Sequence, residues 1–216
     1  MTCPQCSGIE QYFDQKVADQ DLERYLSRGP DKTTQMLIDA VKSLDLADQT
    51  LIDIGGGVGV ISHELLQDGV THAIHVEASS AYYAVAKREA ERRGVADRFH
   101  YFLGNFVDLS EDIPAADIVT LDRVICCYHD VERLVDSSTK LAKSAYALVY
   151  PRDAWWTKAF TRLQNLLFKW RGSLFRVYVH PIREVDSRIR KRGFQLLSLR
   201  KTLVWEVALY RRGPTR

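Results

Sequence analysis

A cluster of glycines stands where an apolar stretch ends, in the sequence LIDIGGGVGVIS from Leu51 to Ser62. Four of the five residues 55–59 are glycine, and Asp53 precedes them by two positions. Glycine lets a backbone approach a ligand closely, and bare N–H groups at the start of the next helix favour negative charge. The dinucleotide pattern G-x-G-x-x-G is not met, because Val60 or Ser62 occupies its sixth position. The stretch therefore predicts a ligand-binding turn of another kind, with a purely structural turn as the alternative.

Other side chains suited to ligand binding stand at the ends of later apolar runs. Glu77 ends HAIHVE, where a carboxylate can accept both hydroxyls of a ribose or serve only as a solvated cap. Asn105 follows in LGNF, and its amide offers an acceptor and a donor to a base. Phe106 or Phe102 fits either an apolar wall or the core. Asp122 ends DIVTLD, and because the carboxyl ends of parallel strands meet at one sheet edge, we expect these residues around one ligand.

Residues 53–59 have the order acidic-apolar-Gly-x-Gly-x-Gly, which closely resembles the first motif of class I S-adenosylmethionine (SAM) dependent methyltransferases. The resemblance implies SAM as the cofactor, with its methionine part wrapped by a turn of Gly55, Gly57 and Gly59. It places Asp53 near the cationic amino group, directly or through water.

The same resemblance gives roles to the later strand ends. It implies that Glu77 binds the ribose and that Asn105 binds the adenine, at a position where this superfamily usually has aspartate. It implies that Phe106 forms an apolar wall and that Asp122 lies at the reactive edge of the cofactor. These matches cover about residues 50–150.

Candidate catalytic residues follow the fourth apolar run, in CCYHD from Cys126 to Asp130. Methyl transfer needs an aligned nucleophile, and a hydroxyl nucleophile also needs proton removal, whereas a carboxylate does not. We expect His129 to accept a proton and Tyr128 to orient the substrate. The alternative is that His129 is an exposed residue at the start of a helix, with Asp130 as its cap.

A second resemblance, to Mg-protoporphyrin IX O-methyltransferases, rests on YFD at Tyr12–Asp14, on DRVICCYH, on LVYPRDAWW and on the C-terminal sequence GFQLLSLRKTLVWEVALYRR. It implies that Tyr12 and Phe13 belong to an N-terminal lid helix, with Tyr12 over the active site, and that a long arm follows the fifth strand. The histidine of that family has its place at Cys126 here, and the histidine of this chain comes three residues later.

The elements that must position these residues alternate between strand and helix. The pattern predicts a doubly wound, Rossmann-like α/β fold with a mostly parallel sheet and a C-terminal antiparallel hairpin, which is the class I methyltransferase fold. A helical lid at 1–46 precedes the SAM-binding domain, 47–216, with an inserted arm at 152–181. The expected strands are 50–54, 72–77, 99–103, 117–121, 145–150, 194–199 and 203–210, and the expected helices are 8–26, 36–44, 58–67, 79–93, 130–142, 154–170 and 182–192.

The arm helix carries an apolar stripe with basic residues around it. Three readings stay open, namely packing against the core, a cover for a flat hydrophobic substrate, and weak contact with a membrane surface. Beyond it, Arg176, Tyr178 and His180 alternate on a segment that we expect to cross the pocket, where it could bind an acidic group. The stripe consists of Trp156, Phe160, Leu163, Leu167 and Trp170, and the basic residues are Lys158, Arg162, Lys169 and Arg171.

Charge is distributed unevenly along the chain. Residues 1–151 hold 14 Lys and Arg against 24 Asp and Glu, whereas residues 152–216 hold 16 against 4. The C-terminal third should therefore prefer an anionic partner, which could be a substrate carboxylate, a membrane surface or a nucleic acid. Because its basic residues alternate with core aliphatics, we expect no nucleic acid.

The cysteines and the apolar runs bear on the compartment. No run of 18 apolar residues and no secretory signal occurs, which predicts a cytoplasmic protein. Cys3 and Cys6 form half of a metal motif, and we predict no metal site from that half alone. Together the sequence predicts a SAM-dependent methyltransferase of a small hydrophobic or acidic molecule, most readily at oxygen. The alternatives are an RNA methyltransferase and a non-catalytic, SAM-binding or membrane-associated protein.

Overall fold

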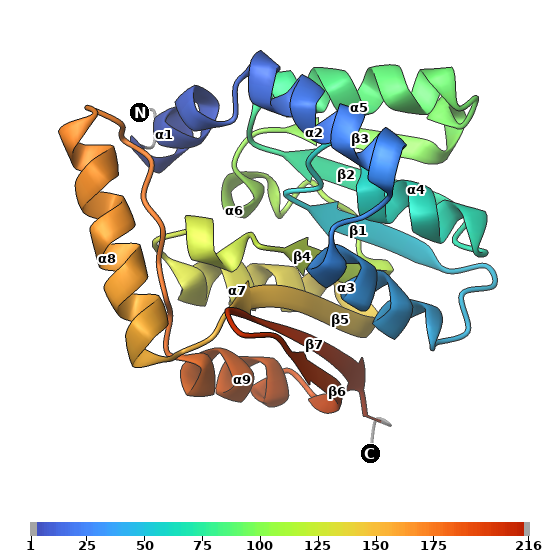
Figure 1. Ribbon diagram of the computed structural model, residues 1–216. Helices are drawn as coiled ribbons and strands as arrows, with labels where there is room; N and C mark the ends of the chain where they lie inside the picture. Colours follow the sequence, from blue (N-terminus) through green and yellow to red (C-terminus); the bar gives the residue numbers. More distant parts are fainter. Residues whose placement is uncertain (1–3, 214–216) are drawn as a thin grey trace.

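A computed structural model describes residues 4–213 and contains one seven-stranded sheet in the order β3-β2-β1-β4-β5-β7-β6 (Figure 1). The first five strands pair in parallel, and β7 runs antiparallel to both β5 and β6. The chain order reverses between β1 and β4, where open α/β sheets bind their ligands. The predicted fold class, including the C-terminal hairpin, is confirmed. The strands are β1 Thr50–Ile54, β2 His72–Glu77, β3 Phe99–Leu103, β4 Ala116–Asp122, β5 Ala142–Pro151, β6 Phe194–Lys201 and β7 Trp205–Arg212.

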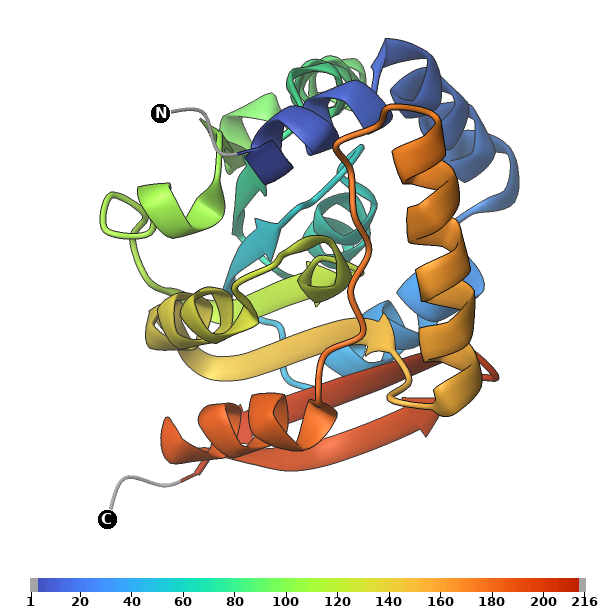
Figure 2. The ribbon, with the colours of Figure 1, turned by 90° about the vertical axis from the view of Figure 1, so that its left-hand side faces the viewer.

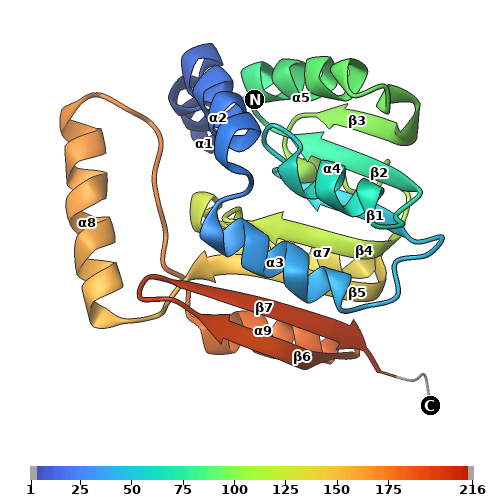
Figure 3. The same cartoon turned by 45° about the vertical axis from the view of Figure 1, so that its right-hand side comes forward.

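Helices cover both faces of this sheet (Figures 1 and 3). The side chains of α6, α7 and α9 pack in one apolar core, and those of α3 and α4 pack in a second core on the other face. Helix α3 thus packs on the sheet although it falls within the predicted lid. The bounds are α3 Lys32–Lys42, α4 Val60–Gln67, α5 Ser80–Arg92, α6 Phe106–Leu109, α7 Val131–Leu141 and α9 Ile182–Lys191, with short 3₁₀ turns η1 Ala96–Arg98 and η2 Ile125–Cys127.

The predicted single helix over residues 8–26 is wrong. The chain instead forms α1 Pro4–Tyr12 and α2 Gln15–Arg28, and it breaks at Phe13. The physical reason is Asp14, whose side chain accepts a hydrogen bond from the Val17 N–H at 2.9 Å and so starts a new helix. This break lets α1 turn across the ends of the strands while α2 packs beside α5.

The arm consists of α8 Trp155–Trp170 and a segment of residues 171–181 that returns to α9. Figure 2 shows this returning segment beside α1 on its way down to α9. The core-packing reading of α8 is wrong, because the residues that α8 buries are Thr157, Thr161 and Phe168, whereas its predicted apolar stripe is exposed. Among residues 4–213, no helix is both long enough and apolar enough to cross a bilayer.

Candidate active site

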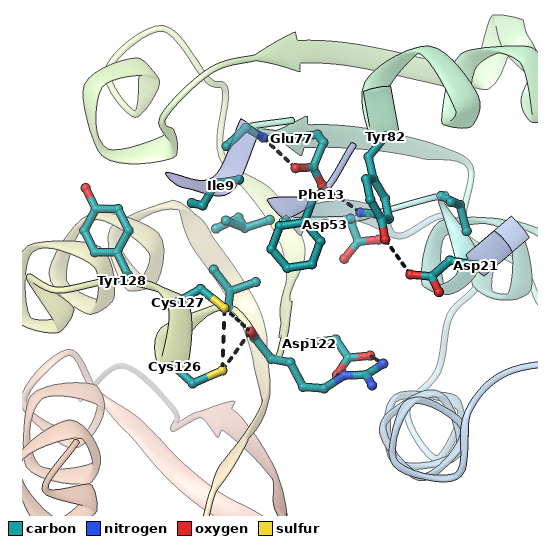
Figure 4. A pocket seen from close by; sticks show the side chains of 18 of the residues that line it. Ile9, Phe13, Asp21, Asp53, Glu77, Tyr82, Asp122, Cys126, Cys127 and Tyr128 are labelled. Carbon is teal, nitrogen blue, oxygen red and sulfur yellow. Dashed lines mark hydrogen bonds and ion pairs between the residues drawn. The ribbon is translucent and has the colours of Figure 1, made fainter. Parts of the chain in front are cut away.

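A pocket of about 560 Å³ opens at the carboxyl ends of β1, β2 and β4 (Figure 4). Pockets of this size hold a cofactor or a drug-sized ligand. Its wall combines two groups of residues. The strand ends contribute Asp53, Gly55, Gly57, Glu77, Asn105, Phe106 and Asp122, and the remaining wall includes Gln5, Ile9, Tyr12, Cys126, Cys127, Tyr128, Phe160, Phe175 and Val177.

The glycine turn leaves β1 in backbone conformations that side chains rarely adopt. Gly55, Gly57 and Gly59 have φ values of 62°, 58° and 86°. A Cβ on Gly55 would stand 2.6 Å from Cγ2 of Val124, a distance that no real contact allows. Gly55 and Gly57 line the pocket, whereas Gly59 is the N-cap of α4 and lies outside the lining. The turn therefore presents bare backbone to the pocket.

Asp53 lies under this turn and is buried. Its carboxylate accepts hydrogen bonds from Thr120 Oγ1 at 2.8 Å and from Ser62 Oγ at 3.1 Å. Burial raises the pKa of Asp53 to about 7, and the nearby carboxylates of Asp122 and Glu77 act in the same direction. A bound cation beside Asp53 would stabilise its charged form.

Glu77 holds the glycine turn to the end of β2. Its Oε2 accepts from the Gly57 N–H at 2.9 Å, and its Oε1 accepts from the N–H groups of Ala78 at 2.7 Å and Ser79 at 2.9 Å. Burial nevertheless raises the pKa of Glu77. A carboxylate has about four accepting positions, so Oε2 keeps one for a further donor such as a ribose hydroxyl. The local sequence gave no indication of these three backbone bonds.

Asn105 and Phe106 stand together after β3 and line the pocket. Asn105 caps the short helix α6, because its Oδ1 accepts from Val107 N–H at 3.4 Å while its Nδ2 donates to Asp108 at 2.9 Å. Phe106 is buried in the core and also lines the pocket, so the two roles considered for it coincide. Phe102 packs against the core and is outside the pocket lining.

Asp122 ends β4 and is paired with a positive neighbour. It accepts from Thr34 Oγ1 at 2.5 Å and from Arg123 Nε at 3.1 Å. Arg123 has a φ of 60° and also reaches Asp31 at 3.2 Å. The Asp122 carboxylate is therefore largely neutralised by Arg123, in contrast to Asp53 and Glu77, which form no ion pair within residues 4–213.

Only two of the three predicted catalytic residues lie in the pocket. Tyr12 and Tyr128 line the pocket, whereas His129 is exposed and outside the pocket lining. The ring of His129 stacks on Tyr128 with centroids 5.4 Å apart, and Asp130 caps α7 by accepting from Arg133 N–H at 3.1 Å. The structure thus brings Tyr12 and Tyr128 to one cavity and leaves His129 outside the lining of that cavity.

Helix α1 and the returning segment form a roof over the pocket, and the contacts between them could not be predicted from the sequence. Gln5 on α1 donates to the carbonyls of Cys127 and Arg176, and Tyr12 stacks on Phe175 with centroids 4.5 Å apart. A Cβ on Gly8 would meet the backbone N of Phe175 at 2.6 Å, so α1 lies directly on the returning segment. An isolated glycine in a helical pattern is the one sequence signal for this contact.

The returning segment is also tied to η2 beneath it. Tyr178 N–H donates to the Cys126 carbonyl at 2.7 Å, and His180 Nε2 lies 2.9 Å from the carbonyls of both Ile125 and Tyr128. Residues 173–181 and α1 therefore cover the pocket together. The segment crosses the pocket as expected, but it lines the pocket with Phe175 and Val177, whereas Arg176, Tyr178 and His180 are outside the lining. The expectation that these three residues bind an acidic group there is therefore not supported.

Charge and ligand chemistry point to a cation in the inner part of this pocket. Asp53 and Glu77 are both buried there, and the charge of Glu77 adds to the effect of burial in raising the pKa of Asp53. A dinucleotide would bring an anionic pyrophosphate to these carboxylates, whereas the ammonium and sulfonium groups of SAM are positive. The bare glycine backbone and the remaining acceptor on Glu77 suit a bound ribose and amino acid. The residues present therefore fit SAM.

Metal ligation has less support. Among residues 4–213, no three His, Cys, Asp or Glu side chains are grouped as they would be around a metal ion. Cys6 lines the pocket, but Cys3 lies outside the described residues, so the Cys3–Cys6 pair stays a sequence hypothesis.

Comparison with known proteins identifies the central part of the chain. Residues 52–148 match a family model described as a methyltransferase domain. Ribosomal protein L11 methyltransferase from Pasteurella multocida is 33% identical over 93 residues, which cover 42% of this chain and 32% of that protein. The corresponding protein from Escherichia coli is 33% identical over 91 residues, which cover 42% of this chain and 30% of that protein. The chain thus matches about a third of the length of these curated relatives.

Solved structures resemble nearly the whole chain. Magnesium protoporphyrin IX methyltransferase from Synechocystis, solved with bound SAH, has a TM-score of 0.74 at 18% identity and covers 97% of this chain and 100% of that chain. An O-methyltransferase family protein from Burkholderia thailandensis has a TM-score of 0.70 at 16% identity and covers 96% of this chain and 64% of that chain. At such identities the likeness establishes the fold. The chain has the class I methyltransferase fold, and residues 52–148 match a methyltransferase domain.

Proposed function

We propose that this protein is a SAM-dependent methyltransferase that acts at oxygen on a small molecule with a hydrophobic body. The observation that carries the proposal is the continuity of one roofed pocket. The pocket begins at the glycine turn and Glu77 and extends to aromatic side chains of α1, α8 and the returning segment. Cofactor and substrate can therefore meet in one continuous space, where the reacting groups can be held in alignment.

The inner part of the pocket has the residues to hold SAM. The backbone of Gly55 and Gly57 would face the methionine part, Asp53 its amino group, and Glu77 the ribose through Oε2. Asn105 and Phe106 would bound the adenine, and Gly59 would start α4 behind the turn. Asp122, already held by Arg123 and Thr34, would define the edge of the reactive region. When bound, SAM supplies an activated methyl group.

The outer part of the pocket suggests the substrate class. The lining contributed by α1, α8, the returning segment and the residues after β4 includes the aromatic and apolar side chains of Ile9, Tyr12, Tyr128, Phe160 and Phe175. Such side chains favour a ligand with apolar surface, and the two tyrosine hydroxyls can orient an oxygen nucleophile by hydrogen bonding. An acidic group on the substrate is a further proposal, since a carboxylate attacks without prior loss of a proton.

The proposal does not assign proton transfer to His129. A general base must come within hydrogen-bond reach of the proton that it removes, directly or through one water. His129 is exposed outside the pocket lining, whereas Tyr12 and Tyr128 form part of it. We therefore propose Tyr12 and Tyr128 as the residues that position the substrate, and His129 remains a sequence hypothesis.

A macromolecular substrate is the second candidate, because the curated relatives are named as methyltransferases of a ribosomal protein. The roof formed by α1 and residues 173–181 favours a small molecule. Gln5 bonds to the Cys127 carbonyl, and the Tyr178 N–H donates to the Cys126 carbonyl at 2.7 Å, so an incoming protein or RNA segment would have to displace these contacts.

The test uses methyl-labelled SAM and a cell extract separated into small-molecule, lipid, protein and RNA fractions. The full chain should transfer label into the small-molecule or lipid fraction, and the label should be released by mild base if it is a methyl ester. A Glu77→Ala variant serves as the control and should transfer little. Label in protein or RNA alone would contradict the proposal, and SAM binding without transfer to any fraction would favour a non-catalytic protein.

A further inference from the structure

Helix α8 turns its apolar side away from the protein. Trp170 is 82% exposed, Trp155 77% and Phe160 66%, and these values are high for side chains of this size. The side that meets the protein carries Thr157, Thr161 and Phe168 instead. The other large apolar side chains that α8 exposes are Trp156, Leu163, Leu166 and Leu167.

The positions of these residues on the helix define an apolar side, its basic borders and a side that faces the protein. At about 100° per residue, all seven exposed apolar side chains fall within an arc of about 140°. Lys158, Arg162 and Lys169 follow one border of that arc, and Arg171 lies at the other border just after the helix. Lys158 pairs with Asp153 at 2.5 Å, and the sequence of α8 itself contains no acidic residue. Cations therefore flank the apolar side.

The turn between β6 and β7 lies near the start of α8 and exposes further apolar side chains. Leu203 is 76% exposed there, and the carbonyl of Val204 accepts from the Arg152 N–H at 2.8 Å, just before α8. Arg152 also lies over the ring of Trp156, 5.6 Å from its centroid. Figure 3 shows α8 standing at the side of the sheet with the tip of the β6–β7 hairpin near its base. We call α8 together with Leu203 and Val204 the outer apolar face.

We propose that the outer apolar face binds the surface of a bilayer that contains anionic lipids. Aromatic side chains stand at both ends of α8, and tryptophan prefers the boundary between headgroups and acyl chains. The bordering lysines and arginines can bury their aliphatic stems while their charges reach lipid phosphates. An apolar side flanked by basic residues is the pattern of a helix that lies in the plane of the interface.

A second copy of the chain would fit this face less well. Two α8 helices packed antiparallel on each other would bring Lys158, Arg162 and Lys169 close to the same residues of the other copy. With no acidic residue in α8, such a pair would gain like-charge repulsion, whereas anionic headgroups neutralise the same cations. Charge complementarity therefore favours the lipid surface.

The face also adjoins the pocket. Phe160 is exposed on the outer apolar face and lines the pocket as well. If the proposed function holds, a membrane-dissolved substrate would have a short path from the bilayer to the active site. Binding to vesicles requires neither SAM nor substrate, so the two proposals can fail independently.

The test is flotation of the full chain with lipid vesicles, together with tryptophan fluorescence. Vesicles of phosphatidylcholine with phosphatidylglycerol should bind the protein and shift its tryptophan emission to shorter wavelength, while pure phosphatidylcholine should bind far less. Arg162→Glu combined with Lys169→Glu should weaken binding to the anionic vesicles at least about 20-fold, because each basic residue contributes about fivefold. Lys140→Glu with Lys191→Glu, on α7 and α9, is the charge-matched control and should bind better than the α8 variant.

Leu163→Ser combined with Trp170→Ser tests the apolar part and should abolish the emission shift. Both side chains are exposed, so circular dichroism and SAM binding should stay as in the parent protein. The proposal is overturned if anionic vesicles bind no protein, or if the α8 variants bind as well as the parent. It is also overturned if the parent protein does not bind vesicles and sedimentation shows that it is a dimer, which the combined Leu163→Ser and Trp170→Ser substitutions dissociate.

Discussion

The two ends of the pocket are built in different ways. The inner end consists of short connections after β1, β2 and β3, where buried groups such as Asp53 and Glu77 are held by nearby hydroxyl and backbone donors. The outer end joins α1 to residues 173–181, more than 160 positions away, through a hydrogen bond from the Gln5 side chain to a backbone carbonyl, the close approach at Gly8 and stacked rings. We therefore propose that the inner end is a fixed cofactor site and that the outer end can vary with the substrate.

Replacement of Glu77 should have the largest effect and should act on the inner end alone. In Glu77→Gln, one side-chain atom becomes an NH₂ that cannot accept from the backbone N–H groups now facing the carboxylate. The substitution also removes the charged acceptor that we propose for a ribose hydroxyl, and because a hydrogen bond to a charged group contributes about 1.5–3 kcal/mol, the Kd for SAM should rise about 100-fold. Isothermal titration calorimetry measures this, with the exposed Glu111→Gln as the matched control. An unchanged Kd for SAM would remove Glu77 from the cofactor site.

Replacement of Gly8 should have an intermediate effect, confined to the outer end. The new Cβ in Gly8→Ala would meet the backbone of Leu174 and Phe175 at 2.6–2.9 Å, so α1 must move away from the returning segment. Hydrogen exchange at the Tyr178 amide should accelerate about tenfold, while the Kd for SAM should change less than about threefold. The exposed Gln11→Ala on the same helix should change neither value. Equal exchange in Gly8→Ala and the parent would show that the roof is not held by this contact.

The sequence predicted the inner end well because its information is local. The glycines after β1 and the residues that end β2, β3 and β4 all follow apolar runs, and the sheet topology brings them together. The contacts of Glu77 with Gly57 could not be predicted, because they depend on the φ and ψ angles of the turn. The contacts of the roof were even harder to predict from the sequence, because no local pattern pairs Gly8 with Phe175 or His180 with Ile125. The sequence left three readings of the apolar stripe of α8 open, because such a stripe does not indicate what covers it.

Replacement of His129 should have the smallest effect, and it tests whether His129 belongs to the outer end of the pocket. A catalytic base would lose about 10²- to 10⁴-fold in turnover on conversion to alanine, as the sequence hypothesis requires. From its exposed position, we expect His129→Ala to retain turnover within about twofold in the labelled-SAM assay. A loss above about 100-fold with unchanged SAM affinity would instead restore His129 as the base.

The most direct test of the account is a calorimetric titration of the full chain with SAM between about pH 5.5 and 7.5. In the free protein, Asp53 is largely protonated below its raised pKa of about 7, and a cation favours its charged form. We predict saturable binding that strengthens as the pH rises toward about 7, and no binding of a nicotinamide dinucleotide. No heat with SAM at any of these pH values, together with saturable binding of the dinucleotide, would contradict the account.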